Sequence, residues 1–147
     1  MKTLITLILT FISFLSFSQV ITVTWNRTKA FNFHGDNARI PEFASAGELL
    51  FDVGGNGKKE LDLVKMESRF YEDNILKNTL KIKSYHKTSQ NRIEIILCDY
   101  DLRTGLPFDT YQIIDTKTNT SYYSWYYGGK DDITWVYIES GGTIKTK

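Results

Sequence analysis

The feature that most constrains the fold of this chain is a succession of short segments in which apolar and polar residues alternate. The clearest runs from 76 to 86. A period of two puts successive side chains on opposite faces of a β-strand, so one face is expected in water and the other on a core. The polar face comprises Lys77, Thr79, Lys81, Lys83 and Tyr85, and the apolar face comprises Leu76, Leu80 and Ile82.

About eight or nine segments of this kind follow one another, joined by turn residues. No amphipathic helical pattern lies between them, whereas a parallel sheet requires such helices as crossovers. The sequence therefore predicts an all-β fold built as an antiparallel meander. A meander can close, fully or partly, into a barrel, or it can fold into a two-sheet sandwich. The long central strands in meander order favour the barrel.

Local turn chemistry predicts where some strands end, with turns expected at Glu72-Asp73-Asn74 and at Thr116-Lys117-Thr118-Asn119. Residues 20–25 are expected to pair in a hairpin with residues 29–33. Gly54-Gly55-Asn56-Gly57 is expected to form a tight hairpin turn, because Asn-Gly tolerates positive φ at both central positions. Gly141-Gly142 is expected to end regular structure and to leave the last five residues frayed.

Residues 1–18 have the pattern of a secretory signal peptide. Lys2 supplies a positive start, residues 4–15 form an apolar run broken only by Thr and Ser, and Ser16-Phe17-Ser18 offers small residues to a signal peptidase. The run is too short for a membrane span and no stop-transfer pattern follows. We expect cleavage before Gln19, which leaves residues 19–147 as a single exported β domain, periplasmic or secreted, with no membrane span.

The nearly equal numbers of acidic and basic residues argue against nucleic acid and anionic membranes as partners. The chain carries 18 basic and 17 acidic residues, and one of the basic residues, Lys2, belongs to the signal, so the exported domain has no net charge. Proteins that bind nucleic acid or anionic membranes carry clusters of Lys and Arg, which are absent from this sequence. Cys98 is the only cysteine, so no internal disulfide can form and the fold depends on packing.

A glycine-rich acidic segment, residues 51–61, resembles the calcium loop of integrin-type FG-GAP repeats. In that family, acidic and amide side chains at alternate positions surround a hard cation, and a Gly permits the sharp turn. Gly54 stands where the family has Asn or Asp, so one oxygen ligand is missing and the affinity for Ca²⁺ would be low. The alternative is a glycine hairpin without metal. The resemblance implies side-chain ligands from Asp52, Asn56 and Glu60, and a backbone ligand from Lys58.

Aromatic residues are concentrated in two neighbouring expected strands, residues 120–127 and 133–140. Both faces of such strands cannot be in water, so at least one aromatic set belongs to the core, where cross-strand packing would stabilise the sheet. An exposed set would instead form an apolar surface with polar tips, suited to a sugar ring or a protein partner. The candidate ligand-binding residues are Tyr122, Tyr123, Trp125, Tyr127, Trp135 and Tyr137.

No recognisable catalytic motif occurs in the sequence. It contains no His-Glu-x-x-His zinc motif, no Gly-x-Ser-x-Gly elbow and no phosphate-binding glycine loop, so we expect no enzyme activity and no cofactor beyond the calcium candidate. The remaining catalytic alternative would require side chains from separate segments to converge in one pocket: His34, Asp36 and Arg39 with Asp99 or Asp101.

The first expected strand permits a comparison with lipocalins, which are exported single-domain barrels with a Gly-x-Trp signature in that strand. Trp25 is present here, but Val23 replaces the Gly, so the resemblance is one of architecture and no family is assigned. The sequence predicts an exported, non-enzymatic domain that presents an aromatic surface or cavity to a carbohydrate, a small apolar ligand or a protein. The alternative is a structural or inhibitory protein, of the envelope or secreted, with no small-molecule ligand.

Overall fold

The computed structural model describes residues 19–36, 38–39, 47–89, 91–128 and 130–147. The signal peptide expected at residues 1–18 lies outside this range. Every regular element within it is a strand: β1 (Val20–His34), β2 (Glu48–Asp62), β3 (Glu67–Glu72), β4 (Ile75–Ser89), β5 (Arg92–Tyr100), β6 (Pro107–Asp115), β7 (Thr120–Tyr127), β8 (Ile133–Ser140) and β9 (Ile144–Thr146). The described residues contain no helical segment with the length and apolarity needed to traverse a lipid bilayer.

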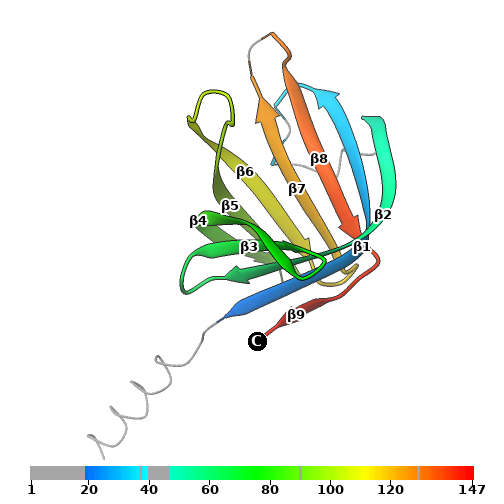
Figure 1. The fold of residues 1–147 in the computed structure, drawn as a ribbon, viewed down its shortest axis with the longest axis vertical. Coiled ribbons are helices and arrows are strands. Elements are labelled where there is room, and N and C mark those ends of the chain that lie inside the picture. The colour runs from blue at the N-terminus through cyan, green and yellow to red at the C-terminus, as the bar shows by residue number, and fades with distance from the viewer. Residues whose placement is uncertain (1–18, 37, 40–46, 90, 129) are drawn as a thin grey trace, which may run out of the picture.

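Strands β1 to β8 close into an antiparallel barrel (Figure 1). From β2 to β8 each strand pairs with the next one along the chain, and β1 pairs with both β8 and β2. The ninth strand, β9, pairs with the first half of β1. The all-β class, the antiparallel meander and the barrel are thus confirmed. The two-sheet sandwich does not form, because β1 is hydrogen-bonded on both sides and completes the ring.

Aliphatic side chains fill the end of the barrel at which β1 and β9 pair, which we call the closed end. Alternate positions of β5 are directed inward, so Ile93, Ile95 and Leu97 are all buried. The alternation predicted for β4 is present around Ile82, which is buried whereas the lysines beside it are exposed, but Leu76, predicted on the core face, is 51% exposed. The core consists of Ile21, Val23, Trp25, Leu61, Leu63, Ile82, Ile93, Ile95, Leu97 and Ile114.

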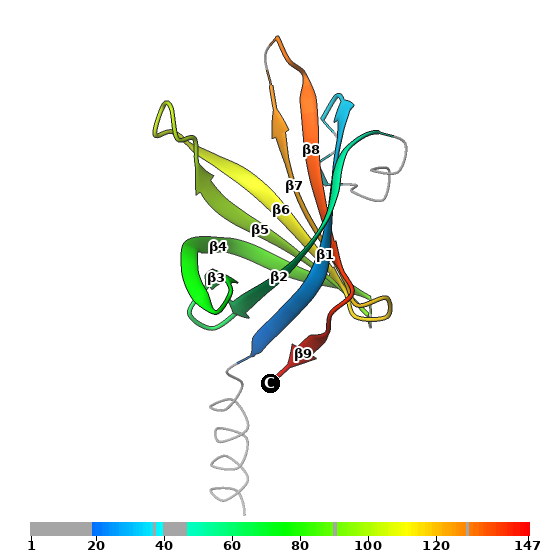
Figure 2. The same ribbon diagram turned by 45° about the vertical axis from the view of Figure 1, so that its right-hand side comes forward.

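At the opposite end of the barrel, two of the ladders between neighbouring strands, β2–β3 and β4–β5, do not continue. The β2–β3 ladder extends only to Gly57 on β2, and the β4–β5 ladder extends only to Cys98 on β5. Within the described chain, residues 48–56 of β2 therefore pair with β1 alone. Figures 1 and 2 show the strands fanning apart towards the loops β5–β6 and β7–β8. We call this the open end.

The first strand differs from the prediction of a hairpin between residues 20–25 and 29–33. That prediction was wrong, because both segments belong to the single strand β1. The β1–β2 ladder shifts register between Trp25 and Arg27, where Asn26 and Arg27 are both exposed. A bulge of this kind bends a strand without ending it. The buried face of β1 consequently changes from odd-numbered residues such as Trp25 to even-numbered ones such as Ala30.

The hairpin turn predicted at Gly54–Gly57 was also wrong, because this run lies inside β2 opposite the bulge in β1. Gly57 makes room for the Trp25 ring, and the run does not reverse the chain. The chain does turn at Asp73–Asn74 and at Asn119, where φ is positive at all three residues, with values of 49°, 63° and 52°. Turns at both places were predicted and are confirmed.

The C-terminal residues were predicted to be frayed, but they are paired with β1. Val20 and Lys147 exchange backbone hydrogen bonds of 3.2 and 3.0 Å, and the Thr24 amide donates to the Thr143 carbonyl over 2.9 Å. The β1–β8 ladder begins only at Arg27, so the preceding residues of β1 would otherwise present an unpaired edge. Pairing of β9 with β1 at residues 21–23 covers that edge.

Candidate functional site

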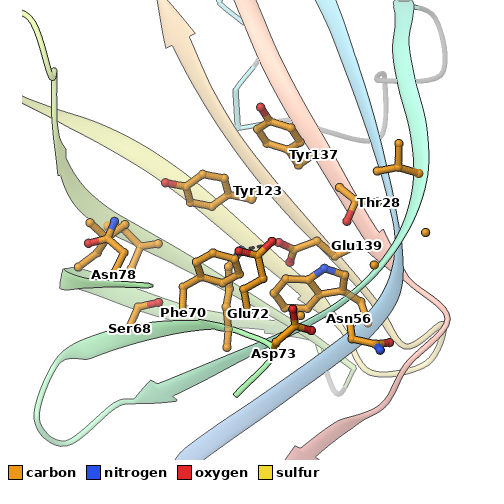
Figure 3. A pocket seen from close by; sticks show the side chains of 18 residues that line it. Thr28, Asn56, Ser68, Phe70, Glu72, Asp73, Asn78, Tyr123, Tyr137 and Glu139 are labelled. Atoms are coloured by element: carbon orange, nitrogen blue, oxygen red, sulfur yellow. Dashed lines mark hydrogen bonds and ion pairs between the residues drawn. The ribbon is translucent and has the colours of Figure 1, made fainter. Parts of the chain in front are cut away.

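A cavity of about 520 Å³ lies inside the barrel above the closed-end core, and we call it the main cavity. Figure 3 shows Tyr123 of β7 and Tyr137 of β8 directed into it, with Phe70 of β3 on another wall. Its volume falls within the range of about 300–1,000 Å³ that is usual for small-molecule sites. The apolar part of the wall is formed by Trp25, Val53, Phe70, Leu80, Leu97, Tyr123 and Tyr137.

The aromatic rings of the main cavity are held in fixed contacts. Trp25 is buried and stacks on Phe70, with the ring centroids 5.9 Å apart and the planes 8° from parallel. The Tyr123 hydroxyl donates to the Asp99 carboxylate over 3.2 Å. Burial raises the pKa of both Tyr123 and Tyr137 above the usual range for a phenol, so both side chains remain neutral hydrogen-bonding groups at physiological pH.

A buried ion pair lies in the polar part of the wall. The Lys59 ammonium contacts the Glu139 carboxylate over 2.7 Å, and the two side chains are 9% and 7% exposed. The ammonium also lies 4.5 Å from the centroid of the Tyr123 ring and 5.3 Å from that of Trp25, within the range of a cation–π contact. The second carboxylate oxygen of Glu139 accepts a hydrogen bond of 2.8 Å from Ser121.

Uncharged polar side chains share this wall with the ion pair. Thr28, Asn56, Ser68 and Asn78 line the main cavity, and Ser68 is buried. The exposed carboxylates of Glu72 and Asp73 lie at its mouth, beside the turn that connects β3 and β4. The main cavity thus combines an aromatic wall with a small group of convergent polar side chains.

A second cavity, of about 420 Å³, lies at the open end, and we call it the upper cavity. Trp125 and Trp135 are cross-strand partners there, with ring centroids 6.2 Å apart and planes 7° from parallel. Tyr137 packs against Trp125 at 5.3 Å and lines both cavities. The aromatic wall therefore continues from the upper cavity into the main one.

A polar cluster borders the upper cavity at the β5–β6 loop. The Tyr127 hydroxyl donates to the Asp101 carboxylate over 2.5 Å and accepts from the Arg103 guanidinium over 3.0 Å. Asp101 also accepts from the backbone amides of Arg103 and Thr104. The hydrogen bond from Tyr127, supported by these amides, lowers the pKa of Asp101 to about 2.

The structure brings most of the predicted ligand-binding residues to one interior surface. Tyr122 is the exception, because alternation along β7 directs it to the outer face and it lines neither cavity. The residues that line a cavity are Tyr123, Trp125, Tyr127, Trp135 and Tyr137.

The residues of the predicted calcium loop lie along β2, and both of its carboxylates are in ion pairs. Arg27 donates two hydrogen bonds of 2.7 and 2.6 Å to Asp52 and lowers the pKa of that carboxyl group. Glu60 contacts the Lys58 ammonium at 3.1 Å, and Asn56 lines the main cavity. Among the described residues no group of three or more His, Cys, Asp or Glu side chains is placed to hold a metal ion.

Two residues of the catalytic alternative, Arg39 and Asp99, lie on opposite faces of the barrel wall. The Arg39 guanidinium lies 5.1 Å from the centroid of the Tyr111 ring, on the outer face of β6. Asp99 instead accepts its hydrogen bond from Tyr123, which lines the main cavity inside the barrel.

Sequence reasoning missed the residues that give the main cavity its polar character, Lys59 and Glu139. They are 80 positions apart, and only closure of the barrel joins them. A signal was nevertheless present, since Glu139 follows Trp135 and Tyr137 on the same face of β8. A charged residue that continues an inward-facing aromatic row requires a buried partner.

Comparison of the chain with protein-family models, with curated proteins and with solved structures gives no match.

Proposed function

We propose that this protein is an exported, non-catalytic barrel that binds a small amphipathic molecule in the main cavity. The observation that carries the proposal is an interior space of about 520 Å³ bounded by aromatic rings and by a few convergent polar groups. In most folded domains of this size the interior is close-packed, so a cavity this large requires an explanation. A bound ligand would supply the contacts that the facing rings lack.

The structure also offers an access route in support of the proposal. Residues 48–56 of β2 have no strand partner on the side away from β1 in the described chain. Three side chains of this segment, Leu49, Phe51 and Val53, are between 38% and 51% exposed. A ligand could enter beside these side chains from the open end without breaking the hydrogen bonds between any two paired strands.

The test uses the uncharged fluorescent probe N-phenyl-1-naphthylamine and the purified domain, residues 19–147. We expect saturable binding of one probe per chain with enhanced probe emission. Asn78→Phe fills part of the main cavity and should weaken binding by about tenfold or more. The matched control is Thr79→Phe, which places the same ring on the exposed outer face of β4. Absence of saturable binding, or an equal effect of the two variants, would overturn the proposal.

A second candidate function, docking of a protein partner without a small-molecule ligand, is favoured by a different surface. The β5–β6 loop exposes Leu102 fully and Leu106 at 66%, and Tyr100 at the end of β5 is 59% exposed. Apolar side chains grouped at a loop tip are typical of interaction sites. Capture of a partner by the wild-type domain but not by a Leu102→Ser/Leu106→Ser variant, with no binding of the naphthylamine probe, would favour this function over the first.

A further inference from the structure

The ion pair in the wall of the main cavity is already complete without a ligand. Glu139 accepts from Lys59 through one carboxylate oxygen and from Ser121 through the other, over 2.7 and 2.8 Å. Ser121 in turn accepts a hydrogen bond of 3.0 Å from the Gln112 amide. The rings of Trp25 and Tyr123 flank the Lys59 ammonium. Neither charge is left without a partner.

This arrangement has a consequence for the charge of a ligand. A carboxylate that approaches Lys59 also approaches Glu139, and an ammonium that approaches Glu139 also approaches Lys59. The opposing interactions largely cancel at such short separation, whereas removal of an ion from water costs free energy in full. A charged head group therefore gains little from this wall and loses its hydration.

Uncharged polar groups of a ligand, in contrast, can gain hydrogen bonds in the main cavity. Ser68 lines the main cavity and is buried, yet its hydroxyl has no hydrogen-bond partner among the described residues. Thr28 and Asn78 likewise face the cavity without a side-chain partner in the described part of the chain. Hydroxyl and amide groups of a ligand could bond to these side chains without the desolvation of an ion.

The carboxylates at the mouth do not alter this balance. Glu72 and Asp73 are exposed to solvent, and Glu72 lies 3.6 Å from the Lys77 ammonium. Exposed charges interact weakly because water and salt screen them. They can attract a cation to the mouth, but they do not compensate an ammonium inside the main cavity.

From these contacts we infer that the main cavity selects uncharged ligands that carry hydroxyl or amide groups on an apolar ring, and that Lys59 and Glu139 together determine this selectivity. The inference rests on the proposed function and specifies the class of its ligand. Of the carbohydrates and small apolar ligands that the sequence indicated, it favours neutral ring compounds, and it disfavours charged molecules such as fatty acids and amines.

The test compares three probes with one apolar skeleton, 1-naphthylacetamide, 1-naphthylacetate and 2-(1-naphthyl)ethylamine, as competitors of N-phenyl-1-naphthylamine at pH 7. We expect the neutral amide to displace the reporter at a concentration about tenfold lower than either charged probe. If the carboxylate or the ammonium displaces it as well as the amide does, the inference is wrong and the proposed function stands. If the reporter itself does not bind, the proposed function fails first.

Two variants then test the role of the ion pair. Lys59→Met leaves Glu139 unpaired and should shift the preference towards the ammonium probe. Glu139→Gln leaves Lys59 unpaired and should shift it towards the carboxylate. An unchanged order of the three probes in folded variants, verified by circular dichroism, would exclude Lys59 and Glu139 as the determinants. If either variant fails to fold, the comparison of the three probes on the wild-type domain still decides the charge preference.

Discussion

Trp25 occupies the space in which a side chain at position 57 would lie. A Cβ atom built on Gly57 would be 2.2 Å from Cε2 and Cζ2 of the indole, far inside van der Waals contact. The two residues are direct partners in the β1–β2 ladder. The absence of a side chain at Gly57 thus lets Trp25 lie flat against β2 and stack on Phe70.

This contact predicts that Gly57→Ala destabilises the protein. The indole is buried, so the added methyl must displace it, and overpacking of this kind costs about 1–3 kcal/mol. Gly55→Ala is the matched control in the same strand, because a Cβ there has no neighbour within 4 Å. We expect its effect to stay within about 0.5 kcal/mol. Urea unfolding of the two variants measures the difference, and equal midpoints would contradict the contact.

The buried ion pair predicts a pattern of non-additive energies. Loss of either partner in Lys59→Met or Glu139→Leu leaves an uncompensated charge and should cost about 3 kcal/mol. The double variant Lys59→Met/Glu139→Leu removes both charges and should be more stable than either single variant, because an apolar pair often replaces a buried ion pair without loss. Urea unfolding of all four proteins completes the cycle. Additive single effects would argue against a direct Lys59–Glu139 interaction.

The hydrogen bond from Tyr127 to Asp101 predicts a change in pH dependence. The pKa of Asp101 in the folded protein is about 2, below the usual aspartate value of 3.8. A lowered carboxyl pKa stabilises the fold above pH 4, and this contribution is lost as the pH falls from about 4 to about 2. In Tyr127→Phe, NMR titration should give a higher pKa for Asp101, although still a lowered one, because the bonds from the Arg103 and Thr104 amides remain. A pKa unchanged from wild type would disprove the role of the phenol.

The ion pairs along β2 predict that calcium does not stabilise the protein. Asp52 is bound by Arg27 and also lies 3.6 Å from the Lys29 ammonium, so a cation would have to displace both. We expect no change in the thermal midpoint between 5 mM Ca²⁺ and EDTA. Arg27→Ala/Lys29→Ala frees the carboxylate and serves as the comparison. A rise in the wild-type midpoint with Ca²⁺ would instead restore the loop of Asp52, Asn56, Lys58 and Glu60 as a metal site.

Local sequence patterns were sufficient to predict the strands with regular alternation. They were insufficient where contacts with distant strands determine the local conformation. The alternation in β4 and the turns at Asp73–Asn74 and Asn119 depend on side-chain period and on backbone φ, which neighbouring residues determine. The glycines of residues 54–57 have the local chemistry of a turn, but the role of Gly57 is set by Trp25, which lies on another strand. The aromatic face of β7 and β8 was predicted from alternation alone. Its partners Trp25, Phe70 and Lys59 come from other strands, and closure of the barrel brings them to it.

The pairing of β9 with β1 predicts protection at the C-terminus that a frayed tail would not have. The amide of Lys147 donates to the Val20 carbonyl, and the amide of Thr24 donates to the Thr143 carbonyl. Hydrogen exchange at Thr24 and Lys147 should therefore be slowed relative to the exposed Leu102 in the β5–β6 loop. Truncation after Gly142 removes these bonds and the contact of Ile144 with the core, and it exposes residues 20–24 as an edge. We expect the truncated domain to unfold at lower urea and to exchange rapidly at Thr24. Unchanged exchange at Thr24 would show that β9 does not pair with β1 in solution.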